Sequence, residues 1–292
     1  MRLILSRKGF DSSAGGCPSP VLPDDSLCVL PIPDPQSRIR FDDVLFENRR
    51  LGKIARDLTG GRIRGGHGAH LDPDLMADGY PRQEGWRPVL GQTGSAQGHL
   101  RNQGVEPGDL FLFFGVFRRA EMHNRRWRFV PGSRPFHAIW GWLHVGQIHA
   151  IDELAPGALP WARYHPHFHG QPDAGNTLYE SSHFCQLPTG TEVFSGSGVF
   201  PKLRDELVLT DPQSRLPTRW RLPAAFYPVG NRSPLSYHSR SDRWQLDSPW
   251  CYLTCAARGQ EFVLNLDAYP DLTGWLAGLL RTGRGTGSES GS

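Results

Sequence analysis

The sequence predicts an α+β fold in which a curved, mostly antiparallel β-sheet, or a partial barrel, carries a few peripheral helices. Apolar and aromatic runs bounded by turn residues outnumber the stretches with helical spacing of apolar residues. The 34 glycines and 25 prolines among 292 residues favour many turns between short elements over a helix bundle. A parallel, doubly wound sheet would need a helix after nearly every strand, and residues 60–107 and 118–135 do not supply these helices.

Four apolar runs are the expected strands of this sheet. Leu3–Leu5 begins the chain and ends at a glycine-containing loop, as a buried strand would. Leu110–Phe117 and Phe136–Ile151 flank an arginine-rich linker, so they are expected to form a long hairpin or meander. Phe262–Asn265 is the last expected strand.

Two segments have the apolar spacing of amphipathic helices. Phe41–Thr59 ends at a pair of glycines, and Leu272–Leu280 follows Pro270-Asp271. We expect a single domain over residues 1–280, followed by a disordered tail at 281–292 that is rich in Gly, Ser and Thr.

The loop after the first strand combines cations, a carboxylate, hydroxyl groups and glycines. Asp11 is a candidate catalytic base, and glycines let backbone N–H groups approach an anion closely. The loop lacks the Gly-Lys-Ser/Thr that closes a Walker motif, and prolines soon after it exclude the helix that a dinucleotide-binding motif opens. The alternative is a tight surface turn. The residues expected to bind a substrate phosphate are Arg7, Lys8, Ser12, Ser13, Gly15 and Gly16.

A second group of polar side chains lies in the irregular region after the first predicted helix. His67, His70, Asp72 and Asp74 fall within eight residues, and they offer nitrogen and oxygen ligands suited to iron, manganese or zinc. Asp72 and Asp74 are also candidate catalytic residues. The alternative is an exposed polar loop in which one of the aspartates caps a turn.

The segment Tyr164–Gly170 contains three alternating histidines. In an extended backbone His165, His167 and His169 would share one face, and Pro166 would keep the segment extended. We expect all three to bind a divalent metal and His165 and His167 to lie within a side-chain length of His70 or Asp72. Iron is the favoured ion, with zinc or manganese as alternatives; a surface loop with stacked imidazoles is the competing interpretation.

Four further residues are candidates for substrate binding. Trp140 and Trp142, with the histidine segment, are expected to surround one pocket on the concave face of the sheet, where a base could stack. Asn176 and Tyr179 begin a strand with polar groups that could contact a base edge or a sugar.

A family resemblance is carried by Arg7-Lys8-Gly9-Phe10-Asp11-Ser12, Gly15-Gly16, Pro18-Ser19-Pro20, Leu30-Pro31-Ile32-Pro33-Asp34, His70–Asp74, Gly108–Gly115 and Trp140–Gly146. With these segments the chain resembles the third of the nucleotide modification associated domain families, over nearly its whole length up to about Leu280. The resemblance implies action on the bases of DNA or on nucleotides. The strands around residues 108–146 also resemble, at fold level, the small PUA-like barrels of base-reading domains.

Composition narrows the function classes. The net charge of +3 is too small to prove nucleic-acid binding, although arginines interleave with tryptophans in several runs. No apolar run is long enough to cross a membrane and no signal peptide is recognisable, so we expect a soluble, cytoplasmic protein. The sequence thus predicts a metal-dependent enzyme acting on nucleotides or nucleic-acid bases. The alternatives are a non-catalytic, PUA-like nucleic-acid-binding module and a sugar-binding or glycosyltransferase-like protein.

Overall fold

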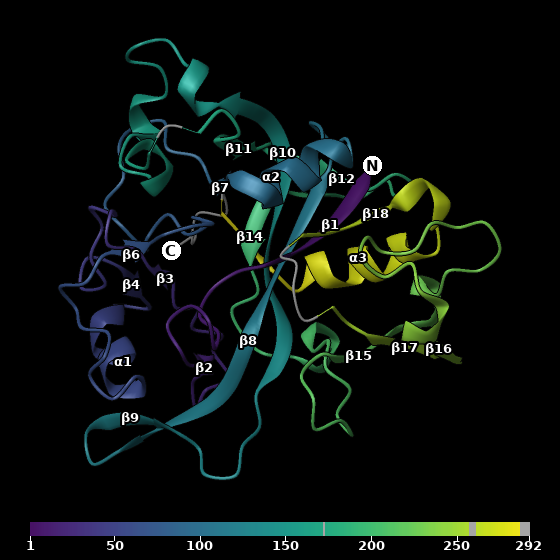
Figure 1. Ribbon diagram of the computed structural model, residues 1–292, viewed down its shortest axis with the longest axis horizontal. Coiled ribbons are helices and arrows are strands. Elements are labelled where there is room, and N and C mark those ends of the chain that lie inside the picture. Colours follow the sequence, from purple (N-terminus) through teal and green to yellow (C-terminus); the bar gives the residue numbers. More distant parts are fainter. Residues whose placement is uncertain (172, 257–260, 287–292) are drawn as a thin grey trace.

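A computed structural model describes residues 1–171, 173–256 and 261–286 of the chain. Its centre is a ten-stranded sheet whose main path runs β18-β1-β8-β10-β11-β7. At the sides, β2 and β9 pair with β8, while β14 pairs with β10 and β19 (Figure 1). The bounds are β1 Arg2–Arg7, β2 Ser19–Val21, β7 Val89–Gln92, β8 Leu110–His123, β9 Arg126–Phe129, β10 Phe136–Ala150, β11 Thr177–Ser181, β14 Ser197–Val199, β18 Glu261–Asn265 and β19 Arg284–Gly285.

The sheet is mixed but mostly antiparallel. The pairs β1–β8 and β2–β8 are parallel, whereas the other strand pairs of the sheet are antiparallel. The predicted hairpin is confirmed, because Phe136 pairs with Phe117 and the register continues to His144 and Leu110. Within the described residues the sheet does not close into a barrel, and the PUA-like form of the fold prediction is not shown.

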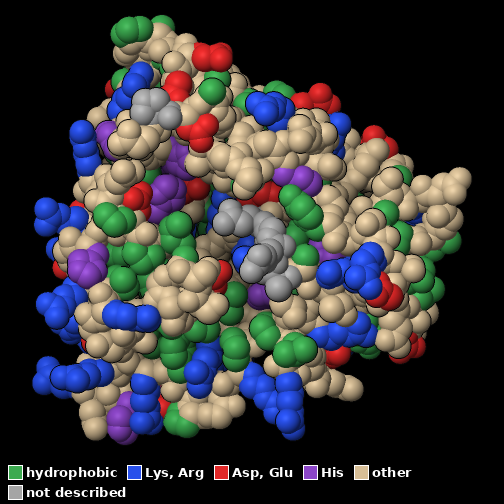
Figure 2. All heavy atoms as spheres, viewed as in Figure 1, with side chains coloured by type: hydrophobic (Ala, Val, Ile, Leu, Met, Phe, Trp, Pro, Cys, Tyr) green, Lys and Arg blue, Asp and Glu red, His purple; other side chains and the backbone are tan. Residues whose placement is uncertain are grey.

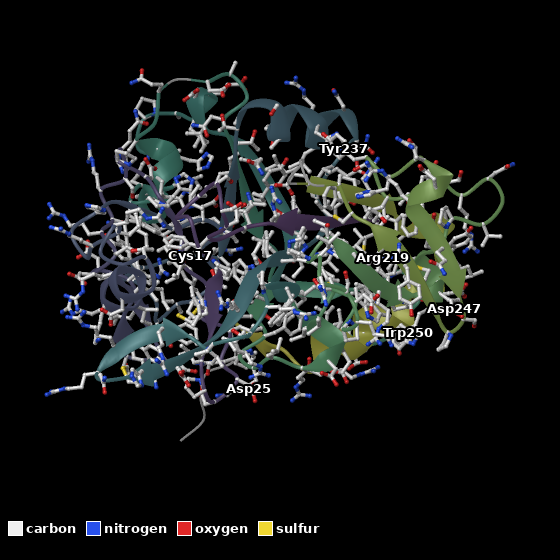
Figure 3. The ribbon with its side chains drawn as sticks, turned by 60° about the horizontal axis from the view of Figure 1, so that its bottom comes forward. Cys17, Asp25, Arg219, Tyr237, Asp247 and Trp250 are labelled. Carbon is white, nitrogen blue, oxygen red and sulfur yellow. The ribbon has the colours of Figure 1, made fainter. Side chains whose placement is uncertain are left out.

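Smaller ladders surround this sheet. The three-stranded sheet β15-β17-β16 forms a separate layer, which Figure 3 shows with Arg219, Asp247 and Trp250 on the side away from Cys17. Trp220 of this layer is fully buried in the core of the large sheet. The remaining strands are β3 Ile32–Pro33, β4 Leu45–Phe46, β5 Arg49–Arg50, β6 Ala69–His70, β12 Phe184–Gln186, β13 Val193–Ser195, β15 Arg219–Pro223, β16 Trp244–Asp247 and β17 Trp250–Thr254.

The central strands are buried because other elements pack on them. Leu3, Ile4 and Leu5 have no exposed surface, and the predicted strands in β1, β8, β10 and β18 are all confirmed. Their side chains share one apolar core with Leu276 and its neighbours in helix α3, Leu272–Arg281. A second, smaller core joins helix α1, Leu51–Leu58, to the hairpin of β8 and β9.

The helices differ in part from the prediction. Three α-helices occur in the described residues: α1 Leu51–Leu58, α2 Gly94–Asn102 and α3 Leu272–Arg281. The helix α3 was predicted, and α1 is the second half of the helix predicted over Phe41–Thr59. The predicted helix from Phe41 was wrong in its first half, because Glu47 and Asn48 have positive φ angles and form the turn between β4 and β5. None of the helices in the described ranges has the length and apolar character needed to cross a membrane.

The tail predicted from residue 281 is described only in part. Arg281 ends α3, and Arg284 and Gly285 pair with β14, so this portion belongs to the sheet. Residues 287–292 lie outside the described residues.

Candidate metal centre

A cavity of about 670 Å³ opens where the loop after β1, the β3–β6 ladder, β7 and the segment before β11 meet. Figure 2 shows histidine and acidic side chains together beside a hollow in the upper left part of the molecule. Eight of the residues predicted from the sequence line this cavity: Arg7, Lys8, Asp11, Ser13, His70, Asp72, His167 and Asn176.

Three of the lining residues form a group that could hold a metal ion. One ligand atom from each of His70, Asp72 and His167 lies within 4.8 Å of the other two. The Nε2 atom of each histidine is 4.0 Å from Asp72 Oδ2. The side chain of His70 is 22% exposed, against 4% for Asp72 and 7% for His167, so His70 lies nearest the opening.

Hydrogen bonds orient both histidines toward this common point. His70 Nδ1 lies 2.9 Å from the carboxylate of Asp34, which follows β3, and the pairing of Ile32 with His70 holds the two segments together. An ionised carboxylate only accepts, so Nδ1 donates its proton and the Nε2 lone pair is free for a ligand bond. The hydrogen bond from His70 also lowers the pKa of Asp34.

His167 is oriented in the same manner by Asn176. The amide nitrogen of Asn176 donates to the backbone oxygen of His167, so its Oδ1 accepts from His167 Nδ1 at 2.7 Å. Burial lowers the pKa of His167 to about 4, which keeps the ring neutral, the form that binds metal.

Asp72 is held as a carboxylate inside the protein. The backbone N–H of Gly91 donates to its Oδ1 at 2.6 Å, and Lys8 Nζ lies 3.9 Å from its Oδ2. Burial by itself would raise the pKa of Asp72, but His165 and the charge of Lys8 outweigh burial and hold the pKa well below its usual range. Lys8 also lies 3.6 Å from Glu261, whose pKa is raised by burial.

A further buried imidazole lies beside the three candidate ligands. His165 is fully buried, its Nε2 lies 3.4 Å from Asp72 Oδ1, and neither ring nitrogen has a hydrogen-bond partner among the described residues. A buried imidazole without partners costs free energy unless another ligand satisfies it. Two oriented imidazoles and one carboxylate could therefore hold a metal ion beside this ring, and the geometry leaves the identity of the metal open.

Gly91 is required by the close approach of β7 to the His167 ring. A Cβ atom built at Gly91 would lie 2.2 Å from His167 Cδ2. We expect Gly91→Ala to displace the ring and to weaken metal binding about tenfold or more, as changes beside metal ligands do. The measurement is competition with a chromogenic chelator.

Gly98 provides the control for Gly91. It lies inside α2 with open space around its Cα, so Gly98→Ala should leave metal affinity unchanged and stabilise the helix by roughly 0.5–1 kcal/mol. Equal metal affinity in the two variants would contradict the role assigned to Gly91.

The histidine segment is not extended as predicted. Pro166–Phe168 forms a single 3₁₀ turn with proline at its first position. The turn nevertheless carries His165 and His167 to Asp72, so the predicted proximity of these residues is confirmed. His169 lies outside the lining of the cavity.

The predicted anion site is not assembled by the loop after β1. The carboxylate of Asp11 accepts hydrogen bonds from the backbone N–H groups of Ser13 and Ala14, and the backbone oxygen of Asp11 accepts from Gly16. These donors are therefore already used, and Lys8 points to Asp72 and Glu261 instead. Gly15 and Gly16 also lie outside the lining of the cavity that Lys8 lines, so the structure does not bring Lys8 and the glycine pair to one site.

Other candidate residues of the loop after β1 and of segment 67–74 do not line the larger cavity. Asp74 is buried and forms an ion pair with Arg82 at 2.5 Å. Arg82 also donates to the hydroxyl of Tyr164, and this hydroxyl donates to Asp74. This network ties the segment after Asp72 to the one before His165. His67 is exposed and accepts a hydrogen bond from the backbone of Arg64, and Ser12, Gly15 and Gly16 do not line the cavity.

The aromatic residues lie in different places from those predicted. Trp142 is 1% exposed, packs on Phe200 with ring centroids 5.0 Å apart, and donates to the backbone oxygen of Ser195. Tyr179 is buried and its hydroxyl donates to Gln97. The prediction of one pocket surrounded by Trp140, Trp142 and the histidines is wrong, because the indole of Trp142 is buried in the apolar core and lines no pocket with the histidines.

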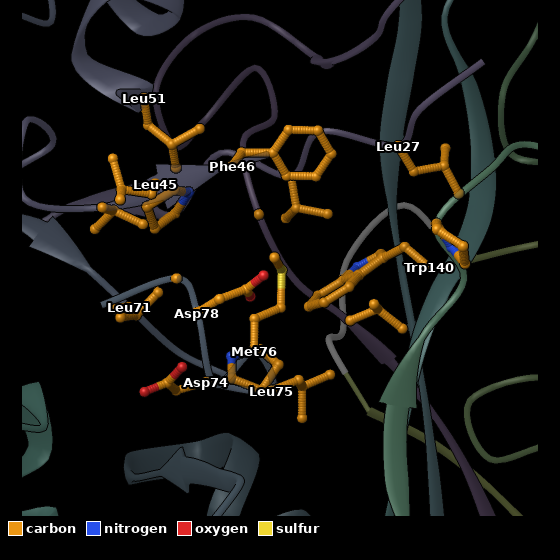
Figure 4. A pocket seen from close by; sticks show the side chains of 18 of the residues that line it. Leu27, Leu45, Phe46, Leu51, Leu71, Asp74, Leu75, Met76, Asp78 and Trp140 are labelled. Carbon is orange, nitrogen blue, oxygen red and sulfur yellow. The ribbon is translucent and has the colours of Figure 1, made fainter. Parts of the chain in front are cut away.

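Trp140 instead lines a separate apolar cavity of about 120 Å³, shown in Figure 4 with Phe46, Leu75 and Met76 around it. Its Nε1 has no hydrogen-bond partner among the described residues. Asp72 lines this cavity as well as the larger one, so the two cavities are neighbours.

The sequence patterns missed several residues of the site. Asp34 follows Pro31 and Pro33, which keep the backbone extended, and this signal could have marked its carboxylate as a partner for a candidate ligand. Gln92 and Glu261 carry no comparable signal, because a polar residue at the end of an apolar strand usually faces solvent. Here they hydrogen-bond to each other, with 2.5 Å between Gln92 Nε2 and Glu261 Oε1.

Comparison with known proteins places this site in a family. The sequence model of the family described as nucleotide modification associated domain 3 matches residues 2–265. The chain belongs to this family. The matched range contains every residue of the candidate metal centre, so the nucleotide modification associated domain includes the cavity and the strands that support it. Comparison with curated proteins and with solved structures gave no match.

Proposed function

We propose that this nucleotide modification associated domain is a metal-dependent enzyme that modifies nucleotides or nucleic-acid bases, with iron as the favoured ion. The observation that carries the proposal is the convergence of His70, Asp72 and His167 on one point in the wall of a large cavity. Two histidines and one carboxylate occur in non-haem iron(II) oxygenases, whereas zinc in such a set would activate water.

The cavity lining suits a base better than a bare phosphate. Besides the cations Arg7 and Lys8, it contains the carboxylates Asp11, Asp34, Asp72 and Asp173. Acidic groups therefore outnumber basic groups, which favours a bound cation and disfavours an isolated anion. Gln92 and Asn176 add amide groups to the lining. Each amide has two N–H groups and an oxygen with two lone pairs, so the hydrogen bonds of Gln92 to Glu261 and of Asn176 to His167 leave capacity for the edge of a base.

Lys8 has a structural role beside the metal ligands. It is 10% exposed and lies between Asp72 and Glu261, so its charge compensates two buried carboxyl groups. Lys8 thereby keeps Asp72 available as an anionic ligand.

The test is metal reconstitution followed by analysis of the substrate. Protein freed of metal is titrated with Fe²⁺, Mn²⁺ or Zn²⁺ and then incubated, with and without oxygen, with nucleotides, DNA and RNA. We expect one ion per chain and a mass change on a base, detected by mass spectrometry of the digested nucleosides, only with the metal present. Absence of stoichiometric binding for all three ions, or unchanged bases with the metal fully loaded, would contradict the proposal.

A further inference from the structure

Charge is distributed very unevenly along this chain. Residues 49–68 and 118–134 together contain twelve of the 32 basic residues and only two of the 29 acidic residues, a net charge of +10. The rest of the chain therefore has 20 basic and 27 acidic residues, a net charge of −7. The overall value of +3 conceals a strongly basic part of the molecule.

The fold brings the two basic segments together. Residues 49–68 contain α1, and residues 118–134 contain the end of β8, the turn and β9. Lys53 of α1 donates to the backbone oxygen of Arg125 at 3.0 Å, and the backbone N–H of Trp127 donates to Asp57 at 3.2 Å. Trp127 is buried in the small apolar core that it shares with Ile54 of α1.

The basic side chains point outward from this joint unit, which we call the arginine face. Eleven of its twelve basic residues are exposed and Arg118 is half-buried. In Figure 2 basic side chains gather along the left and lower edges, where Figure 1 shows α1 and β9. The exposed members are Arg49, Arg50, Lys53, Arg56, Arg62, Arg64, Arg119, Arg125, Arg126, Arg128 and Arg134.

Local acidic residues neutralise only part of this charge. Five of the twelve cations form ion pairs, for example Arg128 with Glu121 and Arg119 with Asp25. Within the described ranges, no ion pair is found for the seven others, which include Arg64, Arg125 and Arg126. An exposed set of like charges without counter-ions raises the free energy of the folded protein, and an anionic partner would relieve the repulsion.

We propose that the arginine face binds the phosphodiester backbone of a nucleic acid. Eleven of its twelve cations are arginines, whose planar guanidinium groups match phosphate oxygens in a bidentate geometry. A helix and a twisted hairpin side by side form an extended basic surface, which fits a polymer of regularly spaced charges better than a single phosphate.

The arginine face also contacts the loop that lines the metal cavity. Arg62 donates to the backbone oxygen of Gly15 at 3.1 Å, and the adjacent Ala14 lines the cavity. A strand bound to this face would thus lie beside the cavity, with its phosphates outside an acidic interior that suits a base. The assignment of the bound polymer as substrate rests on the proposed function, whereas the binding itself does not.

The test compares two triple variants in fluorescence anisotropy with labelled duplex DNA, single-stranded DNA and RNA between low and moderate salt. Arg64→Gln, Arg125→Asn and Arg126→Gln remove three guanidinium groups without an ion partner; asparagine suits the positive φ of 64° at Arg125. We expect binding weaker by on the order of tenfold or more at low salt. The slope of log Kd against log salt should fall by up to about one unit per arginine removed.

The control variant makes the same change in charge elsewhere. Arg101→Gln, Arg204→Gln and Arg215→Gln alter exposed arginines of α2 and of the loops around residues 204 and 215. This control should bind nucleic acid with the same Kd and the same salt dependence as the original protein. Equal weakening in both variants, or undetectable binding by the original protein at low salt, would overturn the proposal. So would binding to anionic phospholipid vesicles without binding to nucleic acid.

Metal content separates this proposal from the proposed function. Both triple variants should retain one metal ion per chain, because none of their residues lies in the cavity. If the protein binds nucleic acid through this face but takes up no metal, only the proposed metal-dependent enzyme is contradicted. If the protein binds metal fully but does not bind nucleic acid, only the proposed role of the arginine face is contradicted.

Discussion

The variants His167→Ala and Asp72→Asn are expected to lose stoichiometric metal. Each removes one of the three ligand atoms that converge within 4.8 Å. Loss of a residue that merely orients a ligand lowers metal affinity by roughly 10–100-fold, so loss of a ligand should exceed about 100-fold. Metal content by mass spectrometry after dialysis, together with chelator competition, gives both the stoichiometry and the affinity.

His67→Ala is the matched control for His167→Ala. His67 belongs to the same predicted ligand set, but it is exposed and does not line the cavity. Its loss should leave the metal content and affinity unchanged. If His67→Ala and His167→Ala behave alike, or if Asp72→Asn retains the metal at full affinity, the centre lies elsewhere.

Trp142→Ala is expected to destabilise the fold by about 3–5 kcal/mol, the range for truncation of a large buried aromatic residue. The indole packs on Phe200, and its removal also leaves the backbone oxygen of Ser195 without this donor. A Cβ at Gly198 or Gly283 would lie 2.3 Å from the Trp142 ring, which shows how closely the backbone surrounds it. Urea unfolding at constant pH measures the loss.

Trp250→Ala tests whether any tryptophan would give the same loss. Trp250 is 38% exposed and its ring lies 4.7 Å from the guanidinium group of Arg221, so its truncation should cost about 1 kcal/mol or less. Unchanged stability in Trp142→Ala, with weaker nucleotide binding, would instead support a substrate contact for Trp142.

The sequence by itself predicted the elements whose signal is local. Leu3–Leu5 and Leu110–Phe117 are continuous apolar runs, and such runs are stable only as buried strands or buried helices. The helix Leu272–Arg281 has a buried face that follows its own apolar spacing. The segments quoted for the family resemblance also sufficed to predict membership, since the family match covers residues 2–265.

Local signals were less informative where tertiary packing decides the conformation. The helix α2 buries only Gln97 and Leu100, so its sequence has little apolar periodicity. Segment 41–50 has helical spacing of apolar residues, yet the two residues with positive φ at 47 and 48 make it a hairpin. Intrinsic preference is weak enough for long-range contacts to override it in both segments.

The residues of the candidate metal centre show the same difference between local signals and tertiary packing. The residue types and spacing of His70, Asp72 and His167 indicate ligands by themselves, because imidazoles and carboxylates cluster in two short segments of the sequence. Tertiary structure alone brings Asp34 and Asn176 to the Nδ1 atoms of the histidines and removes His67 from the set. Whether a side chain can bind the metal depends on distances of a few ångströms between segments that are remote in the sequence. Only the packing of β3, β6, β7 and the loop before β11 determines those distances.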